Sequence, residues 1–230
     1  NAPVAYFDLN TVNYTVKWNL PYKENWRTSI GLSGMNQSNK NKAEEALIPD
    51  YDLFDLGGFV FTQHHQGKLS LSGGLRFDNR HVDGKEMMEG VDTKFAAFTK
   101  NFSNISGSAG ISYEANKEFT LKFNLARGFR APTLAELSSN GAHEGTNRFE
   151  VGNRGLKSET SLQADAGIEF NSEHITLGAG IFYNAISHFI YYRKVLNSAG
   201  DDSLIVDPDS GDLLNVFKFD QQKANLYGLE

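Results

Sequence analysis

A regular alternation of apolar and polar residues recurs along the chain and limits what it can fold into. In residues 161–170, SLQADAGIEF, apolar side chains occupy every second position and polar residues or glycine fill the others. Successive side chains of a β-strand point to opposite faces of a sheet, so this segment predicts a strand with one apolar face. The same pattern occurs at 68–78, 119–126 and 175–183, with weaker copies at 11–18, 26–34, 53–63, 103–113 and 215–229. We therefore expect an all-β chain of about nine strands.

The connections between these expected strands alternate in length. Short polar turns are expected at 19–25, 64–67, 114–117 and 171–174. Long polar segments are expected at 36–51, 80–100, 131–159 and 194–214. In an antiparallel up-and-down sheet, this alternation places every short turn at one end and every long loop at the other. Short periplasmic turns and long extracellular loops are typical of outer-membrane barrels.

Aromatic residues on the apolar face support the same interpretation. They flank the short turns and comprise Trp18, Trp26, Tyr113, Phe119 and Phe170. Amphipathic rings at one height are typical of the interface between a bilayer and water. We predict an antiparallel up-and-down transmembrane β-barrel over residues 1–230, surrounded by outer-membrane lipid. A soluble β-sandwich binding module remains an alternative, although its loops would not separate so cleanly by length.

Composition argues against several other classes. The chain of 230 residues has no cysteine, which excludes disulfides and thiolate metal sites, and a net charge of −6 without a basic block, which argues against a nucleic-acid partner. No nucleophile elbow or phosphate-cradling glycine loop indicates an enzyme. No apolar run reaches the roughly 18 residues of a transmembrane helix, whereas a barrel strand needs only about 9–11.

An odd number of strands indicates that these residues form part of a larger barrel. Bacterial single-chain barrels have an even number of strands. An open barrel leaves two unpaired strand edges, which a bilayer does not tolerate. The alternating pattern also continues to Glu230. We therefore expect an incomplete set of barrel strands.

Several motifs identify a family. The segment GFRAPTLAEL at 128–137 resembles the TonB-dependent outer-membrane receptors, in which a strand ends in Phe-Arg-Ala-Pro and Glu-Leu follows. A second family element, Gly-Asn-Pro-x-Leu-Lys-Pro-Glu, corresponds to GNRGLKSE at 152–159. This sequence departs from it at Arg154-Gly155, where the first Pro is missing, and at Ser158, which replaces the later Pro. The closing NLYGLE at 225–230 is similar to another strand of the family. Ahead of residue 128 only the strand pattern supports the assignment.

The resemblance implies a barrel of about 22 strands that is filled by an N-terminal plug. Residues 1–230 would form a middle part of it, without the plug and the last strands. Such a protein is an active-transport receptor of the bacterial outer membrane. It imports a scarce ligand, such as an iron chelate, haem or a metal ion such as zinc, with energy from the TonB complex acting through the plug. It requires no cofactor and is not an enzyme. A passive porin or an adhesin barrel is the main alternative.

The end of the Phe-Arg-Ala-Pro strand contains two candidate ligand-binding residues. Pro132 lacks an N–H group and cannot continue a central strand, so the strand ends there. Arg127 and Arg130 flank this exit and are candidates to face loop carboxylates or an anionic ligand. The alternative is that both are ordinary arginines of the barrel rim, because exposed ion pairs are common.

Four other residues are candidates for a metal site. His143 and Glu144 lie in the longest loop and carry the N and O ligands that zinc accepts, and His81 and Asp83 lie in the expected loop RHVDG. Loops from one end of a barrel can converge on one ion. This loop region, with FEVGN at 149–153, is also similar to TonB-dependent receptors thought to import zinc. The alternative is solvated loop residues, since neighbours in an extended chain point in opposite directions.

Overall fold

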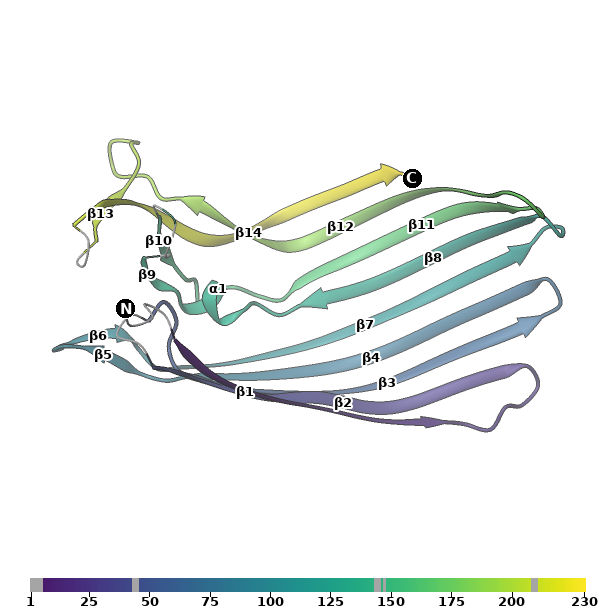
Figure 1. Ribbon diagram of the computed structural model, residues 1–230, viewed down its shortest axis with the longest axis horizontal. Coiled ribbons are helices and arrows are strands. Elements are labelled where there is room, and N and C mark those ends of the chain that lie inside the picture. The colour runs from purple at the N-terminus through teal and green to yellow at the C-terminus, as the bar shows by residue number, and fades with distance from the viewer. Residues whose placement is uncertain (1–5, 43–45, 143–145, 147, 208–210) are drawn as a thin grey trace.

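The computed structural model describes residues 6–42, 46–142, 146, 148–207 and 211–230. They form a long curved sheet (Figure 1). Nine long strands build it: β1 (Phe7–Asn19), β2 (Trp26–Asn41), β3 (Tyr51–Gln66), β4 (Leu69–Gly84), β7 (Phe98–Glu114), β8 (Phe119–Arg130), β11 (Glu159–Asn171), β12 (Thr176–Lys194) and β14 (Leu213–Leu229). Each pairs antiparallel with the next, so the sheet has up-and-down topology and the all-β prediction is confirmed.

Short elements occupy the long connections. They are β5 (Met87–Glu89), β6 (Asp92–Phe95), α1 (Leu134–Ser138), β9 (Asn140–Ala142), β10 (Arg148–Val151) and β13 (Leu204–Val206). The described residues thus form fourteen strands rather than the expected nine or so. The five additional strands have three or four residues each, too few for an alternating pattern to reveal them. In the described part of the chain, no helix is long and apolar enough to cross a membrane.

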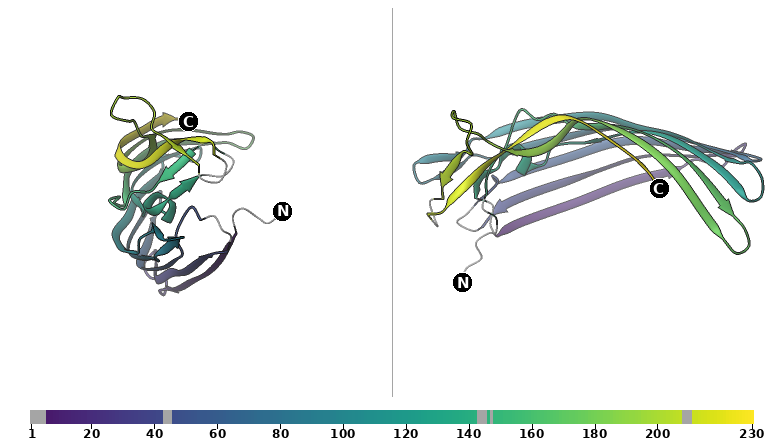
Figure 2. Two further views of the ribbon diagram at one scale, coloured as in Figure 1. Left: turned by 90° about the vertical axis from the view of Figure 1, so that its left-hand side faces the viewer. Right: turned by 90° about the horizontal axis from the view of Figure 1, so that it is seen from above.

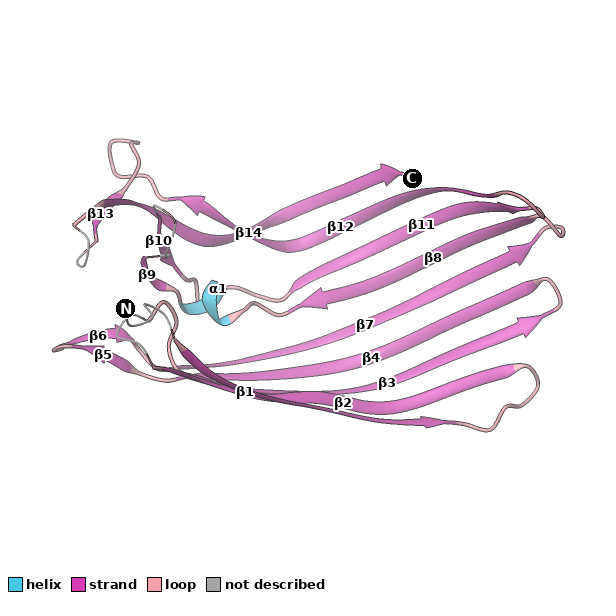
Figure 3. Ribbon diagram, viewed as in Figure 1, coloured by secondary structure: helices cyan, strands magenta, loops and turns pink. Residues whose placement is uncertain are grey.

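The connections are sorted by length between the two ends of the sheet (Figure 3). The turns at 20–25, 67–68, 115–118 and 172–175 lie at one end, which we call the turn end. All the long connections lie at the opposite end, the loop end. The separation that the sequence predicted is therefore present.

The strands extend further toward the loop end than the apolar alternation indicated. β4 continues to Gly84, so His81 and Asp83 lie in a strand and the prediction that they lie in a loop is wrong. At the turn end, His64 and His65 also lie in a strand, β3, rather than in a turn. The reason is that backbone pairing continues where the side chains become polar on both faces, and the sequence pattern does not register this.

The pairing register assigns the residues of the long strands to two faces, because directly paired residues share a face. Trp18, Ile30, Val60 and Leu75 pair in succession and are all exposed. They belong to an apolar face, which we call the outer face. Figure 2 shows that the sheet curves into a trough. The opposite face, the inner face, lies on the concave side, where α1 packs on it, and carries ion pairs such as Arg80–Asp55. No second sheet of the described strands covers the outer face, so the β-sandwich alternative is wrong.

The trough remains open along its length. In the described part of the chain β1 does not pair with β14, and the sheet ends instead with β10 and β9, which continue from the loop end of β14. β10 lies parallel to β14 over Arg148–Val151. The segment between β8 and β11 contains α1, β9 and β10. It folds back over the inner face (Figures 1 and 2).

Candidate functional site

The segment that follows β8 leaves the sheet and begins a short helix, α1. Thr133 is the N-cap: its hydroxyl accepts a hydrogen bond from the Glu136 amide at 3.2 Å, and the Glu136 carboxylate accepts one from the Thr133 amide at 2.8 Å. This reciprocal capping box satisfies two amide groups at the start of the helix. The spacing Thr-x-x-Glu was present in the sequence as a signal for the helix, but sequence analysis expected only a polar loop here.

The helix α1 packs onto the inner face at the loop end. Leu134 and Leu137 contact a buried cluster to which the sheet contributes Leu53, Val82 and Phe102. Leu137 is 1% exposed and Val82 is fully buried. Burying aliphatic side chains of this size stabilises a contact by roughly 1.5–3 kcal/mol each. The connection is therefore anchored to the sheet and forms a shelf across the loop end of the trough.

Arg130 ties this shelf to three strands. Its Nη1 donates to both carboxylate oxygens of Glu136, at 2.9 and 2.8 Å, and its Nη2 donates to Glu159 of β11 at 3.1 Å. The same Glu159 oxygen accepts a hydrogen bond from the Ile190 amide of β12 at 2.9 Å. A planar guanidinium suits such a fork of carboxylates. Arg130 is thus paired with one carboxylate of α1 and one of β11, which agrees with both arrangements that the sequence left open. Ligand binding by Arg130 stays a prediction.

The second family motif packs directly against α1. A Cβ atom added to Gly152 would lie 2.3 Å from the backbone nitrogen of Ser138, so no larger residue fits there without a shift. Gly152 donates its amide to the Ser139 carbonyl at 2.7 Å, and Asn153 donates to the Glu136 carbonyl at 2.8 Å. The two motifs read from the sequence are thus the two halves of one folded unit.

Hydrogen bonds also join this unit to β14 and β7. The Asn153 side chain donates to the Phe219 carbonyl at 3.1 Å. Gln221 accepts from the Lys157 amide at 2.9 Å and donates to the carbonyl of the same residue at 2.8 Å. The Asn104 side chain donates to the Ser158 hydroxyl at 3.0 Å. The shelf therefore has fixed contacts to both sides of the trough.

Two arginines of the shelf segment lie over aromatic rings. The Arg148 guanidinium lies 5.2 Å from the Tyr192 ring centre and 5.7 Å from that of Phe217. The Arg154 guanidinium lies 4.8 Å from the Phe98 ring centre. Delocalised cations next to aromatic faces can bind planar anions by charge and by stacking. The sequence carries no local signal for these contacts, since nothing near Arg148 in the chain links it to rings in β12 and β14.

The inner face between the shelf and the turn end carries ion pairs. Arg80 holds Asp55 with two hydrogen bonds of 2.8 and 2.6 Å, and Arg76 donates through Nε to both oxygens of Asp78 at 2.7 Å. All four side chains are less than one-third exposed. These paired charges give the trough a polar wall with little net charge.

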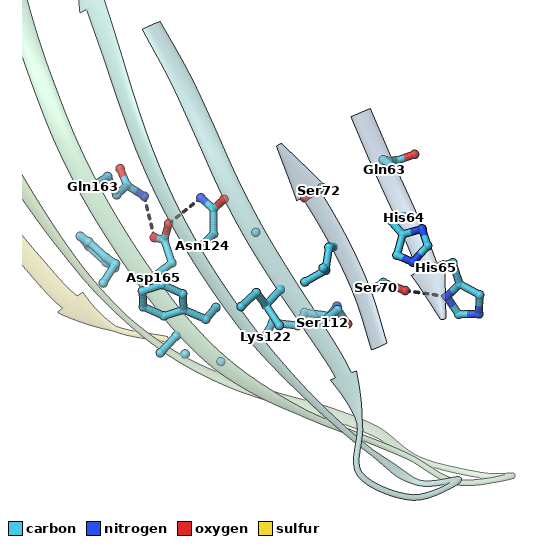
Figure 4. Close-up of a pocket in the computed structure, with 18 of the residues that line it drawn as sticks. Gln63, His64, His65, Ser70, Ser72, Ser112, Lys122, Asn124, Gln163 and Asp165 are labelled. Carbon is cyan, nitrogen blue, oxygen red and sulfur yellow. Dashed lines mark hydrogen bonds between the residues drawn. The ribbon is translucent and has the colours of Figure 1, made fainter. Parts of the chain in front are cut away.

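A hollow of about 990 Å³ lies on the inner face toward the turn end (Figure 4). In it the Asp165 carboxylate accepts hydrogen bonds from Gln163 at 2.7 Å and from Asn124 at 3.3 Å. Lys122, Ser72 and Ser112 complete this part of the wall. The lining combines neutral hydrogen-bonding groups with apolar residues such as Leu71, Ile111 and Phe123, a mixture that suits contact with another protein segment.

The predicted metal-binding residues divide into two groups. His143 and Glu144 lie outside the described residues. His81 lies on the outer face, paired in register with Phe54, and its Nδ1 is 2.8 Å from the Asn101 amide oxygen. No group of three or more His, Asp or Glu side chains suited to a metal ion occurs in the described ranges.

Asp83 is engaged by a cation of the protein. Lys85 donates to its carboxylate at 2.6 Å and lies 2.9 Å from the carboxylate of Asp52. The hydrogen bonds that Lys85 donates to these two carboxylates raise its pKa to about 12. The ammonium group therefore stays charged at neutral pH and remains hydrogen-bonded to the Asp83 carboxylate. His81 and Asp83 face away from α1. Their convergence with His143 and Glu144, which lie outside the described residues, stays a prediction.

Arg127 likewise faces away from the shelf. It pairs in register with Gly107 and Leu162 and so shares the outer face with Leu75. Its Nη1 donates to the carbonyl of Ile105 in β7. The sequence interpretation grouped it with Arg130, but their separation of three positions puts them on opposite faces of β8. Arg127 is therefore not part of the inner-face site.

Comparisons with known proteins agree with this geometry. The family model described as "TonB dependent receptor-like, beta-barrel" matches residues 3–230. The ferric enterobactin receptor of Pseudomonas aeruginosa is 27% identical over 164 residues, which cover 67% of this chain and 18% of that protein. The ferrienterobactin receptor of Escherichia coli K12 is 23% identical, covering 88% of this chain and 27% of that protein. The chain thus spans about a quarter or less of the length of these relatives.

Solved structures have the same fold. The Serratia marcescens hemophore receptor HasR, in complex with its hemophore HasA and heme, superposes with a TM-score of 0.74 at 14% identity. That match covers 97% of this chain and 39% of HasR. The copper transporter OprC superposes with a TM-score of 0.75 at 16% identity, covering 98% of this chain and 35% of OprC. The named relatives are receptors and transporters.

Proposed function

Residues 3–230 belong to the TonB dependent receptor-like β-barrel family, and from this premise we propose that the chain is part of an outer-membrane receptor that imports a scarce ligand with TonB-derived energy. The chain supplies nine long neighbouring strands of the barrel wall and the shelf at the loop end. The proposed orientation places the turn end toward the periplasm and the loop end toward the medium.

The observation that carries the membrane location is the band of outward apolar side chains. On β4 the outward positions from Leu69 to Phe77 are apolar or glycine, and the outward positions beyond them are Asn79, His81 and Asp83. This band covers nine residues, close to the roughly 9–11 that a tilted barrel strand needs to cross a bilayer. Exposed Trp18, Trp26 and Tyr113 lie at the turn-end margin, as an interfacial aromatic girdle requires.

We further propose an iron chelate as the ligand. The enterobactin receptors named above are relatives of this chain, and the pair Arg148–Tyr192 at the loop end offers a cation beside an aromatic face. Such a surface suits an anionic chelate with planar groups. Haem is a second planar anion that the same surface would accept. A metal ion such as zinc is the alternative and would depend on His143 and Glu144 of the long loop.

Transport would involve two further partners. The inner face, with its ion pairs and its hollow, would contact an N-terminal plug, through which the TonB complex acts. Outer-membrane lipid would surround the outer face. The described parts of the shelf, 131–142 and 148–158, would form a fixed wall of the entrance, because Arg130 and the cluster around Leu137 hold them to the sheet.

The test is uptake and binding by the full-length protein. Uptake of radiolabelled ferric enterobactin would be measured in cells that express the protein, once with and once without an intact TonB complex. Binding of the same chelate would be titrated on the purified protein in detergent. Saturable, TonB-dependent uptake supports the proposal. Uptake that rises linearly with concentration and does not require TonB would identify a passive porin instead.

A matched pair of variants tests the ligand surface. Arg148→Ala is expected to weaken binding about tenfold, the loss of one charge-assisted contact. Arg27→Ala is the control, because Arg27 also lies over an aromatic ring, that of Tyr22, at 5.8 Å, but at the turn end. Equal affinities for the wild type and Arg148→Ala would remove Arg148 from the site.

A further inference from the structure

A groove of about 530 Å³ crosses the apolar outer face from β3 to β11 and is lined mainly by β4, β7 and β8. Its floor consists of Gly73, Gly107 and Ala109, and its walls include Leu75, Leu125 and Leu162. In the register of the sheet, Gly73 pairs with Ala109, and Leu75 pairs with Gly107. Small outward residues thus lie among large ones and leave a depression in a surface that is otherwise covered by aliphatic side chains.

The floor of the groove cannot readily be filled at Gly107. A Cβ atom at this position would lie 2.8 Å from the carbonyl oxygen of Gly74 and 2.8 Å from a methyl group of Leu75. Close backbone approach therefore requires glycine here. At Gly73 the situation differs, since an added Cβ would meet only the Ser108 carbonyl, at 3.6 Å.

Arg127 lies at the loop-end rim of this groove. On β8 it follows the outward residues Phe119, Leu121, Phe123 and Leu125, so it is the first charged outward position beyond the apolar band. One guanidinium nitrogen donates to the Ile105 carbonyl, whereas an arginine has five N–H donors. Among the described residues no carboxylate forms an ion pair with it. The groove is apolar along its length and carries an unneutralised cation at one end.

We propose that this groove binds one acyl chain of a phosphorylated lipid and that Arg127 holds the phosphate of its headgroup. The charge distribution is complementary: the ligand has an apolar chain and an anion at its end, and the groove has apolar walls and a cation at its rim. Arginine side chains at a bilayer margin place their apolar stem along the protein and their charge at the headgroup level. The inference rests on the proposed membrane location and adds a specific lipid site to it.

The experiment is native mass spectrometry of the full-length protein released from detergent micelles. The probes are phosphatidic acid, the diacylglycerol of the same acyl chains, which lacks the phosphate, and inorganic phosphate. The variants are Arg127→Gln, which removes the charge, and Gly73→Leu, which fills the groove where a Cβ fits. Lys40→Gln is the control, because Lys40 is an outward cation on β2 that does not line the groove. Circular dichroism verifies that each variant is folded.

The wild type is expected to retain phosphatidic acid about tenfold more than diacylglycerol, the value of one charge-assisted contact. Arg127→Gln should remove this preference and leave diacylglycerol binding in place. Gly73→Leu should reduce the retention of both lipids, and Lys40→Gln should change neither.

Three results would overturn the proposal. They are equal retention of phosphatidic acid by the wild type and Arg127→Gln, retention that is unaffected by Gly73→Leu, and displacement of the lipid by millimolar inorganic phosphate. The first result would indicate a non-specific lipid annulus. The second would indicate that the lipid binds elsewhere on the protein, and the third would indicate a site that binds only the phosphate group. Failure of the proposed function is separate, since it would appear as a full-length protein that does not fractionate with the outer membrane.

Discussion

The anchoring of α1 makes a quantitative prediction about local opening of the shelf. Leu137 is 1% exposed and lies in the cluster with Val82 and Phe102 on the inner face. Replacing a buried leucine by alanine costs about 3 kcal/mol, from lost transfer free energy and from the cavity left behind. If the shelf opens as a local unit, Leu137→Ala lowers its opening free energy by about that amount. Each 1.4 kcal/mol is a factor of ten, so amide exchange should accelerate about 100-fold.

The assay is hydrogen–deuterium exchange of the full-length protein in detergent, resolved to peptides from 131–158. The informative amides are those of Leu137 and Ser139, which donate within the helix to the carbonyls of Thr133 and Ala135 at 3.1 and 3.0 Å. Leu75→Ala is the matched control, because Leu75 is 63% exposed on the outer face, and its loss should leave exchange in the shelf unchanged.

Two results would refute this reasoning. Exchange within 131–158 that is already fast in the wild type would show a mobile lid in solution, with no anchoring contribution for Leu137 to lose. Acceleration spread equally over β4, β7 and β8 would show that the shelf opens only with the whole sheet. Either result would remove the fixed wall from the proposed entrance.

Other substitutions test the same geometry. Gly152→Ala should raise exchange in α1, because its Cβ would lie 2.3 Å from the Ser138 nitrogen, and unchanged exchange would contradict the tight contact. Arg130→Lys should lower the opening free energy of the shelf by about 1 kcal/mol, since one ammonium group cannot span Glu136 and Glu159 as the guanidinium does. Unchanged amide exchange in this variant would show that the Arg130 ion pairs do not stabilise the shelf. In zinc calorimetry of the full-length protein, His81→Ala should have no effect because His81 faces outward, and any zinc binding should be lost in His143→Ala. Loss of binding in His81→Ala would show that this residue reaches the loop site.

The residues that form the shelf could be predicted only in part. The two motifs at 128–137 and 152–159 stood out in the sequence, yet neither indicated that Gly152 packs on Ser138 or that Arg130 bridges to Glu159. Contacts between residues 14 or more positions apart depend on how the chain returns to the sheet. Arg148 and Arg154 carried no local signal, since their aromatic partners Tyr192 and Phe98 lie in other strands.

The sequence by itself determined the nine long strands, their antiparallel order and the sorting of the loops between two ends. These properties depend on local chemistry, because a period of two follows from the geometry of an extended backbone. The tertiary structure decided how far each strand continues beyond the apolar band. Pairing is a long-range property, and it extends β4 to Gly84 and β8 to Arg130, so that the alternation places His81, Asp83 and Arg127 on the outer face and Arg130 on the inner face. Residues that are neighbours in the sequence motif therefore serve opposite surfaces of one wall.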